Sequence, residues 1–180
     1  GSSNVVVAVI DSGVADHPDL GNVDFSLGVD TISDTLESGD GDGVDLDARD
    51  PGKLYPSYQD YQSHGTHVAG TVGASGNNNQ GLSGVNWNVT IMPIRALGVN
   101  GTGSCWGITE GMKWAGQITN ATGMVPSKKA DIINMSLGGS PACPGSHDIV
   151  NQLVANGVIV IAAAGNESTS SPSYPAALNN

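Results

Sequence analysis

The stretch Asn4-Val-Val-Val-Ala-Val-Ile-Asp11 (NVVVAVID) indicates the fold class most clearly, because an unbroken apolar run ends there in a single carboxylate. A run of β-branched residues without polar interruption is typical of a strand that is buried on both faces, as in the interior of a parallel sheet. We therefore expect residues 4–10 to form a strand inside an α/β domain.

Similar apolar runs predict further buried strands, over Val89–Ala96, Ala130–Met135 and Val158–Ala164. Between the strands, helical patterns run from His64 to about Ser75, from a cap at Ser104 to about Ile118, and from a cap at Ser146 to a stop at Gly157. Residues 26–60 are polar, acidic and rich in turn residues, and we expect a long irregular excursion there. The alternation predicts a three-layer, doubly wound α/β fold with a mostly parallel sheet.

The composition of the 180-residue chain suits one globular domain and excludes several functions. Hydrophobic residues make up 38% of the chain, yet no apolar run is long enough to span a membrane. We find no basic segment followed by an apolar one, so we expect no signal peptide. A net charge of −11 argues against nucleic-acid and anionic-membrane partners and fits a secreted, extracellular protein.

Polar or small residues directly follow the first, third and fourth predicted strands. Asp11 follows the first, Ser136-Leu-Gly-Gly139 the third, and Gly165-Asn166-Glu167 the fourth. Because the carboxyl ends of parallel strands meet at one edge of a sheet, we expect these residues to lie close together, near the helix that begins at His64.

Two kinds of chemistry compete for His64 and His67, which lie in the stretch HGTHVAG. Both could share a helix face and bind a metal, but a third ligand at a recognisable spacing and the glutamate of a zinc-protease motif are missing. Alternatively, one histidine is the base that serves a nucleophile. A buried carboxylate such as Asp11 would orient it, and an amide such as Asn166 would stabilise an oxyanion.

The blocks VAVIDSGV (7–14), SHGTHVAGT (63–71), INMSLGG (133–139) and AAAGNE (162–167), in this order, resemble the subtilisin-like serine proteases, or subtilases, particularly those that bacteria secrete. The resemblance extends from about Asn4 to Pro175. It implies a subtilisin-like fold, a secreted serine endopeptidase that acts on proteins or peptides, and a propeptide before maturation.

The resemblance also implies roles for individual residues, which are those known for subtilisin and are carried over by position. Asp11 and His64 correspond to the carboxylate and the general base of the catalytic triad, and Asn166 corresponds to a donor of the oxyanion hole. Two segments correspond to the walls that pair with an extended substrate: Gly101, Thr102 and Gly103, and Ser136, Leu137 and Gly138.

The sequence departs from the family at the nucleophile, because no Gly-Thr-Ser-Met-Ala-like block follows Asn166. We therefore expect residues 1–180 to be the N-terminal portion of a single peptidase domain, with the serine supplied by a missing segment or a second chain. One alternative is an inactive pseudoprotease or peptide-binding fragment. Another is a calcium-stabilised structural domain without enzymatic activity.

The segment GDGDGVDLDARDPG (39–52) is dense in carboxylates, which repel one another unless they are solvated or bridged by a cation. Related secreted subtilases resemble this stretch and often hold calcium in it, and calcium takes about six to eight oxygen ligands. We expect a structural calcium ion here, with a solvated loop as the alternative, and no organic cofactor. The candidate ligands are Asp40, Asp42, Asp45, Asp47 and Asp50.

Cys105 and Cys143 are the only cysteines, and two cysteines do not by themselves define a redox compartment. In a doubly wound sheet, the helix start at Cys105 and the loop that follows Gly139 are neighbours. We expect a disulfide that braces the substrate-binding wall, with two free thiols as the alternative.

Overall fold

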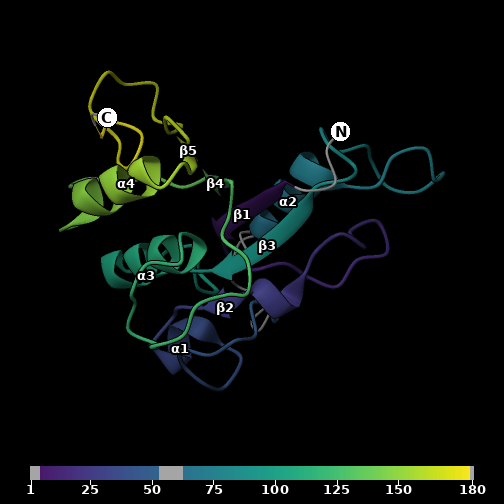
Figure 1. Ribbon diagram of the computed structural model, residues 1–180, viewed down its shortest axis with the longest axis horizontal. Coiled ribbons are helices and arrows are strands. Elements are labelled where there is room, and N and C mark those ends of the chain that lie inside the picture. The colour runs from purple at the N-terminus through teal and green to yellow at the C-terminus, as the bar shows by residue number, and fades with distance from the viewer. Residues whose placement is uncertain (1–4, 53–62, 179–180) are drawn as a thin grey trace.

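The computed structural model describes residues 5–52 and 63–178, which form a five-stranded sheet flanked by helices (Figure 1). The strands are β1 (Val6–Asp11), β2 (Val29–Asp30), β3 (Thr90–Arg95), β4 (Ile132–Met135) and β5 (Ile159–Ala162), all parallel, in the order β2-β3-β1-β4-β5. The helices are α1 (Thr35–Ser38), α2 (His64–Gly73), α3 (Cys105–Ala115) and α4 (Ser146–Ala155), with a short 3-10 turn η1 (Phe25–Leu27).

Strand β1 is the centre of the fold, because every one of its residues is buried and it pairs with β3 on one side and β4 on the other. Alternate side chains point to opposite faces of the sheet. Ile10 joins one apolar cluster with Met112 of α3 and Leu153 of α4. Val9 joins a second cluster with Ala69 of α2. The three-layer, parallel α/β prediction is confirmed.

The helix ends confirm some sequence signals and correct others. Ser104 caps α3 as predicted, with its hydroxyl oxygen accepting the N–H of Gly107 at 3.0 Å. The predicted cap at Ser146 is wrong: Gly145 is the N-cap of α4, in a left-handed conformation (φ 76°), and the Ser146 hydroxyl instead donates to the Cys143 carbonyl. Gly157 follows the end of α4 with φ 78°, as a terminating glycine should.

The prediction that residues 26–60 are irregular is wrong for part of that range. Val29 of β2 pairs with Ile94 of β3, and Asp34 caps the single turn α1 by accepting the N–H of Leu36 at 2.8 Å. Elements this short contain too few residues to show a periodic pattern. Residues 53–60 of that prediction lie outside the described residues.

The other element bounds differ from the predictions by a few residues. Helix α2 ends at Gly73 instead of about Ser75, and β5 covers 159–162 instead of 158–164. Helix α3 ends at Ala115 because Gln117 takes a left-handed backbone conformation (φ 52°). Among the described residues, no helix is long and apolar enough to cross a membrane.

Candidate active site

Asp11 is the last residue of β1, and its carboxylate is fixed from two directions. Its Oδ1 accepts the backbone N–H of Ser12 at 2.8 Å. His64 places Nδ1 2.8 Å from Oδ1 and 3.0 Å from Oδ2. The Asp11 side chain is only 1% exposed, whereas that of His64 is 43% exposed. A buried carboxylate therefore orients a histidine that solvent or a substrate can reach.

His64 occupies this position because the first turn of α2 packs directly on the end of β1. A Cβ atom at Gly65 would lie 2.2 Å from the Gly13 carbonyl oxygen and 3.1 Å from Cβ of Asp11, so only glycine fits there. The Gly65 N–H donates to the Ser12 hydroxyl oxygen at 3.0 Å, while Ser63 makes no capping bond with its side chain. A distant side chain thus replaces the local cap.

The electrostatics of the pair suit a base that accepts a proton on its outer nitrogen. Burial raises the pKa of Asp11, and the hydrogen bonds from His64 and Ser12 partly offset this rise. When Nδ1–H of a neutral His64 donates to Asp11, the lone pair of the imidazole is on Nε2. Nε2 can then take a proton, and the carboxylate stabilises the resulting imidazolium.

The remaining residues predicted for catalysis and substrate binding line one cleft of about 690 Å³. His64 lines this cleft together with Asn166 and with both predicted substrate-binding segments, 101–103 and 136–138. Asn166 is exposed, follows Gly165 in a left-handed conformation (φ 98°), and its side-chain amide has no hydrogen-bond partner among the described residues. The structure therefore brings these residues together, as the sequence predicted.

The cleft also contains groups that sequence analysis had not assigned to it. Tyr174 and Pro175 line it, and the backbone of Tyr174 exchanges two hydrogen bonds with Gly139, at 2.8 and 2.9 Å. No periodic signal marks this pairing of a loop with a distant segment. The predicted disulfide between Cys105 and Cys143 is present, and both cysteines line the cleft.

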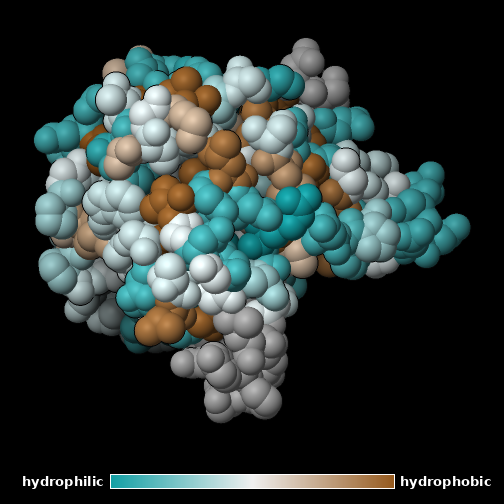
Figure 2. Space-filling view, turned by 90° about the horizontal axis from the view of Figure 1, so that it is seen from below, coloured by the Kyte–Doolittle hydropathy of each residue, from teal (hydrophilic) through white to brown (hydrophobic). Residues whose placement is uncertain are grey.

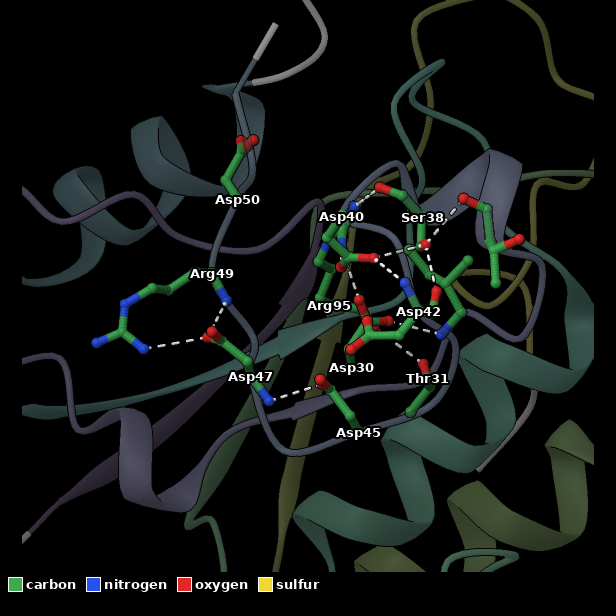
Figure 3. Close-up of polar contacts among 12 residues, drawn as sticks. Asp30, Thr31, Ser38, Asp40, Asp42, Asp45, Asp47, Arg49, Asp50 and Arg95 are labelled. Atoms are coloured by element: carbon green, nitrogen blue, oxygen red, sulfur yellow. Dashed lines mark hydrogen bonds and ion pairs between the residues drawn. The ribbon is translucent and has the colours of Figure 1, made fainter. Parts of the chain in front are cut away.

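The structure does not gather the five candidate calcium ligands into one group. Among residues 5–52 and 63–178, no three Asp, Glu, His or Cys side chains are grouped so that they could hold a metal ion. Figure 2, which views the molecule from the side of α1, shows hydrophilic residues next to several apolar patches. Figure 3 shows the acidic side chains pointing in different directions: Asp40, Asp42, Asp45, Asp47 and Asp50.

Two of these five carboxylates are held by side-chain donors of the protein, whereas Asp50 Oδ2 is buried without a hydrogen-bond partner among the described residues. Asp40 pairs with Arg95 and accepts the Ser38 hydroxyl at 2.7 Å, and Asp47 accepts from Arg49 at 3.1 Å. Burial alone would raise the pKa of Asp40, but Ser38 and Arg95 together hold it below its usual value. The five side chains therefore do not converge on a single point, and a calcium ion in this segment stays a prediction. Arg95, the partner of Asp40, is a residue that the sequence did not assign to the segment, although a charged residue inside the apolar run VTIMPIRA was a signal.

His67 is exposed on α2. No group of three metal-binding side chains includes His64 and His67 among the described residues, so a metal at these two histidines has no support from the structure. The base interpretation of His64 is the one that the contact with Asp11 favours.

Comparisons with known proteins give consistent results. The family model described as the subtilase family, Peptidase_S8, matches residues 2–180. An extracellular protease of Xanthomonas campestris pv. campestris is 39% identical over 97% of this chain, and subtilisin E of Bacillus subtilis is also 39% identical over 97%. A solved protease structure from Pseudoalteromonas arctica superposes with a TM-score of 0.85, at 38% identity, over 96% of this chain.

The chain is shorter than these relatives. It spans 31% of the Xanthomonas protein and 38% of subtilisin E, and it covers 53% of the solved chain.

Proposed function

The chain belongs to the subtilase family, and on this premise we propose that it is the Asp- and His-bearing part of a secreted serine endopeptidase. The observation that carries the proposal is the contact between Asp11 and His64 Nδ1 at 2.8 Å, at the edge of a cleft that Asn166 also lines. The catalytic serine comes from a further segment or a second chain. Below, "the completed protease" means this chain together with that serine.

In this proposal the substrate peptide lies extended between segments 101–103 and 136–138, and its scissile carbonyl faces His64. His64 accepts the proton of the serine hydroxyl on Nε2 as the oxygen–carbon bond forms. It gives this proton to the amine nitrogen when the carbon–nitrogen bond breaks. Water then hydrolyses the acyl ester, and His64 takes the proton of that water and returns it to the serine oxygen.

Asp11 and Asn166 stabilise the charges that form during the reaction. Asp11 keeps Nδ1 of His64 protonated and stabilises the imidazolium, and its burial keeps water from competing for the contact. Asn166 donates from its side-chain amide to the oxyanion of the tetrahedral intermediate, together with the N–H of the serine. The free amide of Asn166 in the present structure supports this role, since it is available to a ligand.

The partners and location follow the same proposal. The substrates are proteins or peptides, and a propeptide precedes maturation. The protease is extracellular, a location that the name of the Xanthomonas relative, an extracellular protease, supports. Subtilases generally bind calcium and use no organic cofactor. Calcium binding by this chain, at the acidic segment 39–52, stays a prediction.

Intact mass spectrometry with a phosphonylating serine inhibitor tests the proposal. We expect one inhibitor adduct on the polypeptide that carries the serine, and no adduct when His64 is replaced by alanine, because the serine is then not activated. A protein that gains no adduct and cleaves no peptide would favour the alternative, a peptide-binding module that uses the same cleft without catalysis.

A further inference from the structure

Arg95 connects the end of the catalytic strand to the acidic segment. It is the last residue of β3, lies in register with Asp11, and is 1% exposed. The two residues that follow it, Ala96 and Leu97, both donate their N–H groups to the Asp11 carbonyl oxygen, at 2.8 and 3.1 Å. The backbone at Arg95 is therefore fixed against β1.

The guanidinium of Arg95 points away from this backbone into the loop that contains α1, as Figure 3 shows. Nη1 contacts Asp30 Oδ2 at 2.6 Å and also Asp40, and Nη2 donates to the Ser38 carbonyl. The planar guanidinium carries several donors in a fixed arrangement, so a single side chain holds two carboxylates and a carbonyl in defined positions. This group sets the position of residues 38–40.

The same loop supports one wall of the cleft. The Glu37 carbonyl oxygen, next to Ser38, accepts the N–H of Val99 at 2.9 Å. A Cβ atom at Gly98 would lie 2.4 Å from the same oxygen, so the two backbones are in close contact. Gly98 in turn donates to the Thr102 carbonyl at 2.8 Å, and Thr102 lines the cleft.

We propose that Arg95 is a positioning residue for substrate binding: through Ser38 and Glu37, it holds the segment 98–103 in the position that pairs with an extended peptide. The inference rests on the proposed function for the identity of the ligand. Arg95 does not touch the reacting atoms. Its effect is specific to substrates that are long enough to contact the wall at 101–103.

The test compares two substrates of the completed protease, one short, with a single residue before the scissile bond, and one long, with four. Replacing Arg95 by Met should raise KM for the long substrate about tenfold and leave kcat and the short-substrate KM within about twofold. Arg95→Lys should restore part of the loss, since lysine keeps the charge but not the planar set of donors. Equal losses on both substrates, or none on the long one, would contradict the inference.

Arg49 provides a matched control. It lies in the acidic segment 39–52 and pairs with Asp16 and Asp47, but its side chain is 45% exposed. Arg49→Met should leave both substrates unchanged. If Arg95→Met does not fold, Asp40→Asn weakens the same contact at a side chain that is 24% exposed, and should raise KM for the long substrate about threefold. An unchanged long-substrate KM in Asp40→Asn would then contradict the inference.

Failure of the proposed function can be distinguished from failure of the inference about Arg95. A wild-type protein that cleaves neither substrate contradicts the assignment as a protease and says nothing about Arg95. In that case the dissociation constant of a fluorescent long peptide replaces KM. We expect Arg95→Met and Asp40→Asn to bind this peptide more weakly than the wild type, and Arg49→Met to bind it equally well. An equal dissociation constant in all of them would contradict the inference.

Discussion

The two sides of the candidate active site differ in how many contacts fix their side chains: the Asp11–His64 side has several, and the Asn166 side has none in the described part of the chain. On one side, Asp11 is fully buried and its carboxylate accepts hydrogen bonds from His64 and Ser12. On the other side, Asn166 is exposed and its side chain has no partner among the described residues. The side chain that we propose as the general base is therefore already oriented, whereas the proposed oxyanion donor is not.

The difference follows from the position of each strand in the sheet. Strand β1 has a neighbour on each side and buries all of its residues, so the residue at its end is surrounded by packed atoms. Strand β5 pairs only with β4 among the described strands, and its Ile159 and Ile161 are 58% and 50% exposed. A site needs support from neighbouring side chains to hold its geometry, and the centre of the sheet provides more of it.

The largest effect on activity should come from removing His64, on the well-supported side of the site. In the completed protease, His64→Ala should lower kcat by about 10⁶-fold, the size of loss known for subtilisin, which we carry over to this relative. The exposed His67, on the same helix, is the control, and His67→Ala should leave kcat within about twofold. Steady-state kinetics on one peptide substrate measures both, and a small loss in His64→Ala would show that His64 is not the base.

A smaller effect on activity should come from removing the exposed side-chain amide of Asn166. Asn166→Ala should lower kcat by about 10²- to 10³-fold with little change in KM, because an oxyanion donor acts mainly in the transition state; this loss is likewise the one known for subtilisin. Asn151, exposed on α4, serves as the control for a change of the same type. If Asn166→Ala raises KM and leaves kcat unchanged, the residue binds substrate and does not stabilise the oxyanion.

The same contrast predicts a difference in stability between the two strands. Ile10 of β1 is 0% exposed, so Ile10→Ala should lower the free energy of unfolding by about 2–5 kcal/mol. Ile159 of β5 is 58% exposed, and Ile159→Ala should cost less than about 1 kcal/mol. Urea denaturation measures both. Similar losses would mean that atoms outside the described residues cover Ile159.

The sequence predicts the Asp11–His64 side of the site well, because the signals for these two residues are local and strong. An apolar run that ends in Asp11, and a helix start at His64 among small residues, both depend on neighbouring positions in the chain. The acidic segment was harder to interpret. The cation that pairs with Asp40 is Arg95, 55 positions away, and neither local periodicity nor composition identifies such a partner. A dense group of carboxylates is equally consistent with a metal ion, solvent or an arginine.

The last prediction concerns pH and a second buried carboxylate, that of Asp30 at the end of β2. Burial raises its pKa from 3.8 to about 7, although the guanidinium of Arg95 acts to lower it. Between these two pH values, the folded state holds a proton that the unfolded state has lost. The contribution of Asp30 to stability is therefore fully present below about pH 4, and it declines as the pH rises through about 7.

Thermal unfolding at several pH values, with Asp30→Asn as the control, isolates this contribution. Asparagine does not titrate, so the Tm of the wild type relative to that of Asp30→Asn should fall from pH 5 to pH 7 and level off above about pH 8. The opposite slope would show that Arg95 keeps Asp30 ionised in the folded state. Arg95 would then stabilise a charged carboxylate at the end of β2, as His64 does at the end of β1, and the acidic loop would be as firmly held as the catalytic pair.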